Sequence, residues 1–312
     1  GDILKDRKVI AVSGTHGKTT TSYMLVHIFA NHGRDIGFLV GGVSSNFKTS
    51  AYLGTDEVFV IEADEYDSAF FDKRSKFIHY SPHTVIINNI EFDHADIFND
   101  ISDIKRQFHH LLKIIPSNGN VIYFKNDQNT QDVIEMGSWS NLIRIDDETD
   151  INYKLKEFSD SSEKYCLKDM PLIGDHNFKN YVSAILAAKT DSIKVKESIA
   201  LLKSFDGVKR RLEFKGTYSN IKLYDDFAHH PTAITFASES IKDQFKSEKV
   251  LGLVELGSNT MSDGYHGAKL LDSVKPLDHV IWLDHKEVLN ESSKIKVEKN
   301  VNDLIYAVKK II

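Results

Sequence analysis

A short apolar strand that leads through a glycine turn into a helix is the feature that most constrains this sequence. The segment is VIAVSGTHGKTTT, residues 9–21. Glycines let backbone N–H groups approach an anion closely, and the positive end of the following helix favours negative charge. We expect Lys18 to reach the outer phosphates of a nucleotide and the Thr19 hydroxyl to hold Mg²⁺. The alternative is a tight turn with a chance Gly-Lys-Thr, since Val12 stands where the usual phosphate loop has its first glycine.

The rest of the chain alternates short apolar segments with longer helical patterns. This alternation is typical of an α/β fold, in which helices flank a mostly parallel sheet. In the first part, the sequence predicts strands at residues 8–13, 58–63, 84–90, 120–124 and 142–145, and helices at residues 18–31, 101–115, 177–189 and 194–204. The polar stretch 146–164 is expected to form hairpins or an exposed connection.

The pattern restarts after residues 205–208. Strands are predicted at residues 221–225, 250–255 and 279–283, and helices at residues 231–245 and 268–273. We therefore expect a P-loop-type α/β domain at residues 1–207 and a smaller Rossmann-like α/β domain at residues 208–312. The sequence begins without a methionine and stops straight after a helical pattern. We expect it to start within a longer protein and to lack the end of the second domain.

The composition and charge of the chain argue against several classes of protein. The 312 residues are 41% hydrophobic and carry a formal charge of −6, which gives no general attraction for nucleic acid or anionic membranes. The single cysteine, Cys166, cannot form an intramolecular disulfide, and no apolar run approaches the roughly 20 residues that span a bilayer. A cytoplasmic protein without nucleic-acid or membrane partners is the expectation; the oligomeric state stays open.

Two further predicted strands end in polar side chains that suit a metal ion. In IEADEYD, residues 61–67, Glu62 lies nearest the strand and offers the hard oxygen that Mg²⁺ prefers. The strand at residues 84–90 runs into Glu91, Asp93 and His94, and His94 is a second candidate ligand. A solvated acidic turn and a surface or capping histidine are the alternatives.

A third polar segment opens an alanine-rich helix. GDHNFKNY, residues 174–181, offers His and Asn side chains with both donors and acceptors, as an adenine edge requires. The same residues are equally well explained as a helix cap by Asp175 or Asn177. Beyond the expected domain boundary, the basic cluster 209–211 would clamp phosphate charge or form a solvated linker.

The order of these segments carries a resemblance to a known family. Its most specific parts are EADEYDSAFFDKRSKF at residues 62–77, NNIEFDHADIF at residues 88–98 and QFHHL at residues 107–111. With the phosphate loop, they resemble the Mur ligases, most closely the murein peptide ligases, over almost the whole chain. The resemblance implies phosphate binding by Gly14, Thr15, Gly17, Lys18, Thr19 and Thr20, nucleotide contacts by Asn89, His176, Asn177 and Asn180, metal binding by Glu62 and His94, and completion of the ATP site by Arg211 and Asp225.

The resemblance also implies a reaction. Family members use ATP and Mg²⁺ to join an amine to a carboxylate through an acyl phosphate, and the implied substrates are UDP-N-acetylmuramate and the tripeptide L-alanyl-γ-D-glutamyl-meso-diaminopimelate, in peptidoglycan recycling. An α-amine with a pKa of about 8 must lose a proton before it attacks, so a histidine is a reasonable base. His229, implied to lie near the incoming amine, and His109 are the candidates.

Three departures from the family pattern affect these implications. Residues 106–110 read RQFHH where other Mur ligases carry a carbamoylated lysine, so we expect no carbamate and a histidine in its place. Gly257 stands where an arginine is expected, which bears on recognition of the peptide's carboxylates. The family's amino-terminal domain is absent, so this chain alone is expected to be inactive. The alternatives are a ligase for L-alanine or for glutamate on folate, and a non-catalytic ATP-binding protein.

Overall fold

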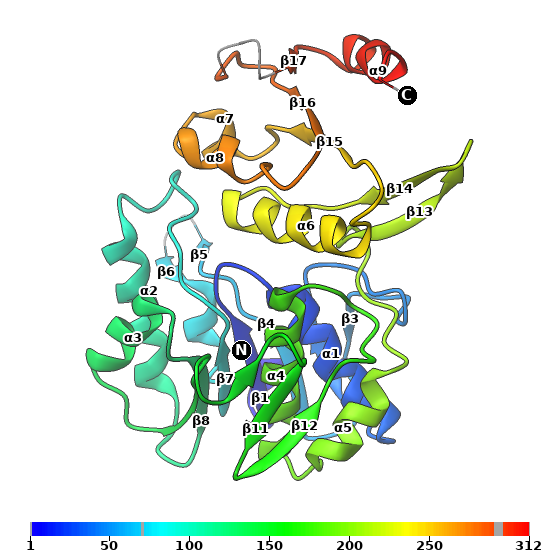
Figure 1. Ribbon diagram of the computed structural model, residues 1–312. Helices are drawn as coiled ribbons and strands as arrows, with labels where there is room; N and C mark the ends of the chain where they lie inside the picture. The colour runs from blue at the N-terminus through cyan, green and yellow to red at the C-terminus, as the bar shows by residue number, and fades with distance from the viewer. Residues whose placement is uncertain (1, 70–71, 290–295, 312) are drawn as a thin grey trace. The chain divides into compact units, whose positions relative to one another are not determined.

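The computed structural model describes residues 2–69, 72–289 and 296–311 (Figure 1). These residues form two compact units. One contains the residues up to Phe92 together with Ile97–Lys209, and the other contains Asp93–Asp96 together with the residues from Arg210 onward. Among the helices of the described residues, none has both the length and the apolar composition needed to cross a bilayer.

A seven-stranded sheet forms the centre of the first unit. Its strand order is β3-β2-β4-β1-β7-β8-β9, and every neighbouring pair is parallel except β2 with β3. The strands are β1 (Lys8–Ser13), β2 (Gly37–Leu39), β3 (Ala51–Tyr52), β4 (Val58–Glu62), β7 (Thr84–Ile87), β8 (Asn120–Phe124) and β9 (Asn141–Ile145). The predicted α/β class is therefore confirmed. The strand predicted at residues 84–90 is too long, and the short strands β2 and β3 were not predicted.

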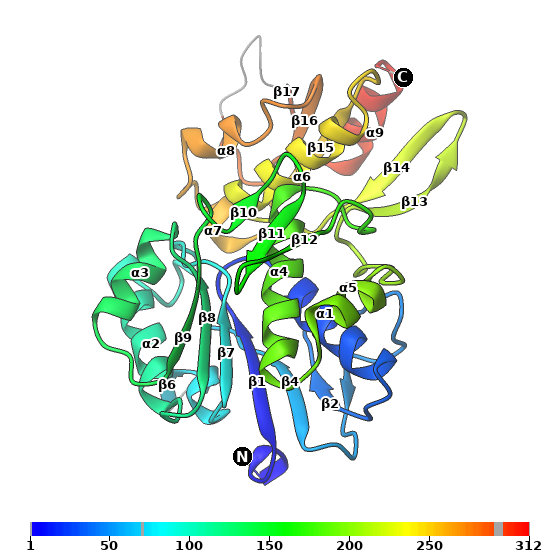
Figure 2. The same ribbon diagram turned by 60° about the horizontal axis from the view of Figure 1, so that its bottom comes forward.

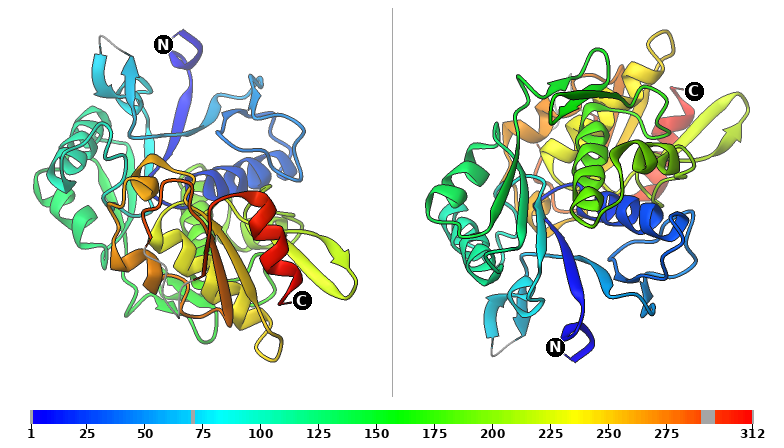
Figure 3. Two further views of the ribbon diagram at one scale, coloured as in Figure 1. Left: turned by 90° about the horizontal axis from the view of Figure 1, so that it is seen from above. Right: turned by 90° about the horizontal axis from the view of Figure 1, so that it is seen from below.

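Helices cover both faces of this sheet because its central strands are apolar on both sides. Ile10 and Val12 of β1 belong to one buried cluster, and Val9 and Ala11 belong to the other. The first cluster is completed by α1 (Lys18–Asn31), α4 (Asp175–Thr190) and α5 (Val195–Leu202), and the second by α2 (Ile101–Ile114) and α3 (Gln128–Glu135). Figure 2 shows the two helical layers, and the right panel of Figure 3 shows α1 beside α4. Helix α3 was not predicted.

Smaller elements complete the first unit. They are two 3₁₀ helices (Asp2–Leu4 and Lys76–His79), the hairpin of β5 (Asp67–Ala69) and β6 (Asp72–Ser75), and an antiparallel sheet of β10 (Ile151–Asn152), β11 (Glu157–Asp160) and β12 (Glu163–Cys166). The last sheet confirms the hairpins predicted at residues 146–164.

The second unit combines a hairpin with a small parallel sheet. The hairpin is β13 (Glu213–Tyr218) with β14 (Ile221–Asp225), and the sheet has the order β15 (Leu251–Glu255), β16 (His279–Leu283), β17 (Lys296–Glu298). The helices are α6 (Pro231–Gln244), α7 (Asn259–Ser262), α8 (Ala268–Asp272) and α9 (Val301–Lys309). Trp282, Met261 and Leu270 lie in its apolar core. β13, β17 and α7 were not predicted.

Candidate functional site

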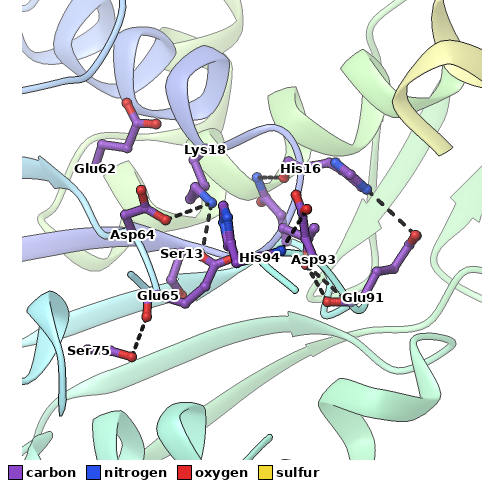
Figure 4. Close-up of polar contacts among 12 residues, drawn as sticks. Ser13, His16, Lys18, Glu62, Asp64, Glu65, Ser75, Glu91, Asp93 and His94 are labelled. Carbon is purple, nitrogen blue, oxygen red and sulfur yellow. Dashed lines mark hydrogen bonds and ion pairs between the residues drawn. The ribbon is translucent and has the colours of Figure 1, made fainter. Parts of the chain in front are cut away.

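Three loops that follow neighbouring parallel strands lie at one edge of the first unit's sheet. β1 lies between β4 and β7, so that Val12 pairs with Glu62 on one side and with Ile86 on the other. Since the carboxyl ends of parallel strands share an edge, the loop 14–17 and the strand ends of β4 and β7 meet there. In open α/β sheets this is the edge where ligands bind. Figure 4 shows the polar side chains at this edge.

The loop between β1 and α1 is fixed by hydrogen bonds to the segment after β7. The Thr15 backbone N–H donates to the Asn89 carbonyl at 3.0 Å, and the His16 backbone N–H donates to Asn89 Oδ1 at 2.8 Å. The Asn88 amide donates to the His16 carbonyl at 3.3 Å and to Thr21 Oγ1 at 3.2 Å. The segment after β7 thus holds the loop through both backbone and side-chain hydrogen bonds. Asn88 did not figure in the sequence prediction.

Two glycines in this loop have no substitute. Gly14 has φ +117°, and a Cβ there would lie 2.7 Å from the Asn89 carbonyl oxygen. Gly17 has φ +80°, and its Cβ would lie 2.5 Å from Asn180 Oδ1. Both the left-handed backbone and the close approach exclude a side chain. Because Gly17 is the N-cap of α1, no N-cap side chain occupies the first N–H groups of the helix, which favour an anion.

Lys18 lies at the start of α1 among carboxylates. Its Nζ is 3.0 Å from Glu65 Oε2 and 3.5 Å from Asp64 Oδ1 (Figure 4). The Lys18 side chain is 12% exposed and that of Glu65 is fully buried, whereas that of Asp64 is 40% exposed. Burial alone would lower the pKa of Lys18, but the charges of Glu65, Asp64 and Glu62 outweigh burial and raise the pKa above its ordinary value. The ammonium therefore stays charged at every physiological pH.

Thr19, at the start of α1, and Glu62, at the end of β4, form a second polar pair beside the loop. The Thr19 hydroxyl donates to Glu62 Oε1 at 2.9 Å, and the Gly41 backbone N–H donates to Glu62 Oε2 at 2.7 Å. A Cβ on Gly42 would lie 2.7 Å from Thr19 Cγ2, so the segment after β2 packs directly on this pair. A hydroxyl and a carboxylate are hard oxygen donors of the kind that Mg²⁺ takes. These residues therefore fit the predicted metal, and the nearby Gly41-Gly42 turn was missed from the sequence.

The asparagines of α4 approach the same loop. Asn180 lies beside Gly17, and its Nδ2 donates to Asn177 Oδ1 at 3.2 Å. Asn177 Nδ2 in turn donates to the Ile173 carbonyl at 2.7 Å. The N-cap of α4 is Gly174, so the alternative in which Asp175 or Asn177 caps this helix is wrong. His176 lies in the first turn of α4. The structure thus brings Asn89, Asn180 and the glycine loop together.

His109 lies elsewhere on the first unit. It is buried on α2, where its ring stacks on Trp139 at 6.3 Å between centroids and faces Gly137. The segment with Gly137 and Trp139 leads into the first residue of β9, which is parallel to β8, so it lies at the amino ends of the strands. Burial and the nearby charges of Lys113 and His110 lower the pKa of His109. This position, at the edge of the sheet opposite the phosphate loop, does not support His109 as the base.

The remaining predicted residues belong to the second unit. The Asp225 carboxylate is 3.5 Å from Arg210 Nε, the Arg211 guanidinium lies 5.7 Å from the centre of the Phe227 ring, and His229 Nδ1 is 2.9 Å from the Phe227 carbonyl. One short segment around Phe227 therefore contains all three predicted residues, Arg211, Asp225 and His229.

His94 and Gly257 are also in this unit. His94 has φ +58°, and its backbone N–H donates to Asp93 Oδ1 at 2.8 Å. Asp93 Oδ1 also accepts from the Thr260 hydroxyl at 3.3 Å, which holds the segment 93–96 to the start of α7. Gly257 is exposed, and a Cβ there would meet no atom closer than 4.0 Å. The space at Gly257 therefore admits a larger side chain.

Comparisons with known proteins identify the family of both parts of the chain. Residues 12–188 match the Mur ligase middle domain, and residues 210–311 match the Mur ligase glutamate ligase domain. The chain is 41% identical over 301 residues to the UDP-N-acetylmuramate–L-alanyl-γ-D-glutamyl-meso-2,6-diaminoheptandioate ligase of Haemophilus influenzae, covering 94% of this chain and 66% of that protein. It is 43% identical over 290 residues to the ligase of the same name from Escherichia coli, covering 90% and 63%.

A solved structure of a murein peptide ligase from Psychrobacter arcticus is also similar. It superposes with a TM-score of 0.72 at 37% identity, covering 98% of this chain and 72% of that one. The chain thus spans just under two thirds of the lengths of the two curated relatives.

Proposed function

Because this chain belongs to the Mur ligase family, we propose that it is the nucleotide-binding part of an ADP-forming ligase. The proposed substrates are UDP-N-acetylmuramate and the tripeptide L-alanyl-γ-D-glutamyl-meso-diaminopimelate, in peptidoglycan recycling in the cytoplasm. The relatives that support this substrate choice are 41% and 43% identical to the chain and are named for that reaction. The single observation that carries the nucleotide assignment is the glycine loop before α1, with Lys18 and the Thr19–Glu62 pair beside it.

The loop suits the phosphates of ATP for physical reasons. The first N–H groups of α1 and the Lys18 ammonium supply positive charge where the β- and γ-phosphates would lie. Thr19 and Glu62 would hold Mg²⁺, which when bound offsets the repulsion between the phosphates and an incoming carboxylate. Asn89, His176, Asn177 and Asn180 would contact the nucleoside, while His94, Arg211 and Asp225 would complete the metal and ATP sites.

The proposed reaction has two steps. The substrate carboxylate oxygen attacks the γ-phosphorus, a P–O bond forms, and the bond from the γ-phosphorus to ADP breaks. The peptide amine then attacks the acyl carbon, a C–N bond forms, and the C–O bond to phosphate breaks. His229 is the proposed acceptor of the amine proton, since the free nitrogen of a neutral imidazole ring can accept a proton from an attacking amine.

The nucleotide assignment is tested by calorimetric titration of this chain with ATP and Mg²⁺. Lys18→Ala should weaken binding by about 1.4 kcal/mol or more, which is about tenfold. Lys105→Ala is the matched control, because Lys105 also forms a close ion pair in the first unit, 2.5 Å from Asp132, but on α2. Equal losses in the two variants, or equal binding by parent and Lys18→Ala, would contradict the assignment.

The substrate assignment is tested separately on the full-length protein. ADP release is measured with UDP-N-acetylmuramate and each of three amines: the tripeptide, free L-alanine, and no amine. Turnover that depends on the tripeptide supports the proposal. A preference for L-alanine would identify an alanine-adding ligase instead. ATP binding without ADP release under any of the three conditions would favour a non-catalytic nucleotide-binding protein.

A further inference from the structure

Among the residues that the structure describes, Lys18 has one fully buried counter-charge, which is the side chain of Glu65 rather than that of the metal candidate Glu62. The distance from Lys18 Nζ to Glu65 Oε2 is 3.0 Å, and the Glu65 residue has no exposed surface. Asp64 is farther from Nζ, at 3.5 Å, and more exposed. A lysine has a flexible four-carbon stem and a strongly hydrated ammonium, so its place in a buried site depends on a fixed partner. Within the part of the chain that the structure describes, Glu65 is the partner best suited to that task.

Glu65 is itself held in place by the hairpin that follows it. The Ser75 hydroxyl donates to the Glu65 carbonyl, and the Ser75 backbone N–H donates to Gln107 Oε1 of α2 at 3.3 Å. The Lys76 backbone N–H donates to the carbonyl of the next residue, Tyr66, at 2.9 Å. The backbone at Glu65 is therefore tied to β6 and α2, two elements outside the phosphate loop. This anchoring sets where the carboxylate can hold the lysine.

We propose that Glu65 is a positioning residue that holds the Lys18 ammonium in register with the phosphate loop. The inference rests on the proposed function, because it takes Lys18 as the group that contacts the transferred phosphate. Misplacing a catalytic group by about 1 Å can lower a rate about 100-fold. Loss of the Glu65 charge also removes a negative group near the phosphates, which offsets the binding lost when Lys18 is displaced, so we expect nucleotide affinity not to fall. Slower turnover with equal or tighter ATP binding distinguishes positioning from a general loss of structure.

The first test observes the lysine directly and needs no turnover. In the full-length protein labelled with ¹⁵N-lysine, the Lys18 ammonium should give a resolved signal at neutral pH, because a buried, hydrogen-bonded ammonium exchanges its protons slowly. Absence of the signal in Lys18→Met assigns it. The signal should disappear in Glu65→Gln, which keeps the shape but not the charge, and persist in Asp64→Asn. Persistence in Glu65→Gln, or no signal in the wild type, overturns the proposal.

The second test measures turnover and ATP affinity. We expect kcat of Glu65→Gln to fall at least tenfold, with an ATP dissociation constant no weaker than that of the wild type. Asp132→Asn, which removes the partner of Lys105 on α2 and so lies outside the phosphate site, is the control and should stay within threefold in both. Glu65→Asp keeps the charge on a shorter arm and should be partly active. It is the deciding variant if Glu65→Gln does not fold, and wild-type kcat in Glu65→Asp would then overturn the proposal.

Two other outcomes of the turnover test also decide against positioning. Parallel losses of kcat, ATP affinity and thermal stability in Glu65→Gln would mean a structural role only. Recovery of Glu65→Gln by excess Mg²⁺ would mean that Glu65 is a metal ligand. A wild-type protein that releases no ADP with the tripeptide refutes the proposed function, and the lysine signal then decides the Glu65 proposal by itself.

Discussion

Replacement of Gly14 by alanine should damage both the fold of the first unit and its nucleotide binding. At φ +117° an L-residue is strained by about 1–3 kcal/mol. The added Cβ would also lie 2.7 Å from the Asn89 carbonyl oxygen and 3.0 Å from the Asn89 nitrogen. Both are backbone atoms that cannot rotate away, and overpacking of this kind costs about 1–3 kcal/mol more. The sum is about 2–6 kcal/mol of unfolding free energy.

Gly33→Ala is the matched control, because Gly33 follows the other end of α1. It has a similar positive φ, +88°, but a Cβ there would meet nothing within 4 Å. Its cost should therefore be the backbone strain alone, about 1–2 kcal/mol. Hydrogen exchange of the α1 amides measures both variants, since each 1.4 kcal/mol changes the opening equilibrium about tenfold. Titration with ATP and Mg²⁺ should show lost binding only in Gly14→Ala. Equal exchange rates in the two variants, or normal ATP binding by Gly14→Ala, would refute the reasoning.

Three further predictions concern charge. Burial lowers the pKa of His27 more than the Leu201 carbonyl and Asp206 raise it, so that below about pH 6.5 the unfolded chain binds a proton that the folded chain does not. The protection of the α1 amides against hydrogen exchange should therefore fall below this pH, by up to about 1.4 kcal/mol per pH unit. His27→Gln should flatten that slope. Because the pKa of Lys18 is raised, its side chain stays charged from about pH 6 to 9. The loss of ATP-binding free energy in Lys18→Ala, measured by calorimetry, should therefore be constant over this range. A loss that varies with pH would contradict a permanently charged Lys18. The Asp226 carboxylate accepts hydrogen bonds from the backbone N–H groups of residues 212 and 228, at 2.8 and 2.7 Å. Asp226→Asn turns an NH₂ group toward one of these donors and should destabilise the second unit by about 1–3 kcal/mol in urea unfolding. An unchanged unfolding midpoint would contradict this prediction and show that the loop adjusts.

The elements around the phosphate loop could be predicted closely from the sequence. The strand at residues 8–13 and the helix at residues 18–31 have the predicted bounds, as do β8, β14 and β16. In each of these strands a local signal coincides with the tertiary requirement, because the apolar run ends at a glycine or a polar residue. The same consistency between local and global preference made the fold class predictable.

Elements that depend on distant contacts could not be predicted. β2 has three residues and begins with Gly37, so no local period marks it as a strand. β7 ends at Ile87, three residues short of the predicted end, and the next residue, Asn88, donates its amide to the His16 carbonyl and to Thr21 Oγ1. His109 was one of two histidines that the sequence offered as a candidate base, and no local pattern shows where its side chain lies. Its position beside Trp139 depends on the packing of α2 against the segment after α3.

The separate contacts of Glu62 and Glu65 show where the alternation of side chains along a strand no longer predicts which way a residue faces. While a strand continues, alternate residues face opposite sides, so Glu62 and Asp64 would share a face and Glu65 would lie on the other. β4 ends at Glu62, however, and beyond it the alternation no longer applies. Asp64 and Glu65 consequently both reach Lys18, while Glu62 bonds Thr19 and the Gly41 N–H. Of these three carboxylates within four residues, Glu62 therefore pairs with Thr19, whereas Asp64 and Glu65 contact Lys18. The Glu65 carbonyl accepts from Ser75, whose N–H donates to Gln107, so that residues 10 and 42 positions farther along the chain fix the backbone at this point.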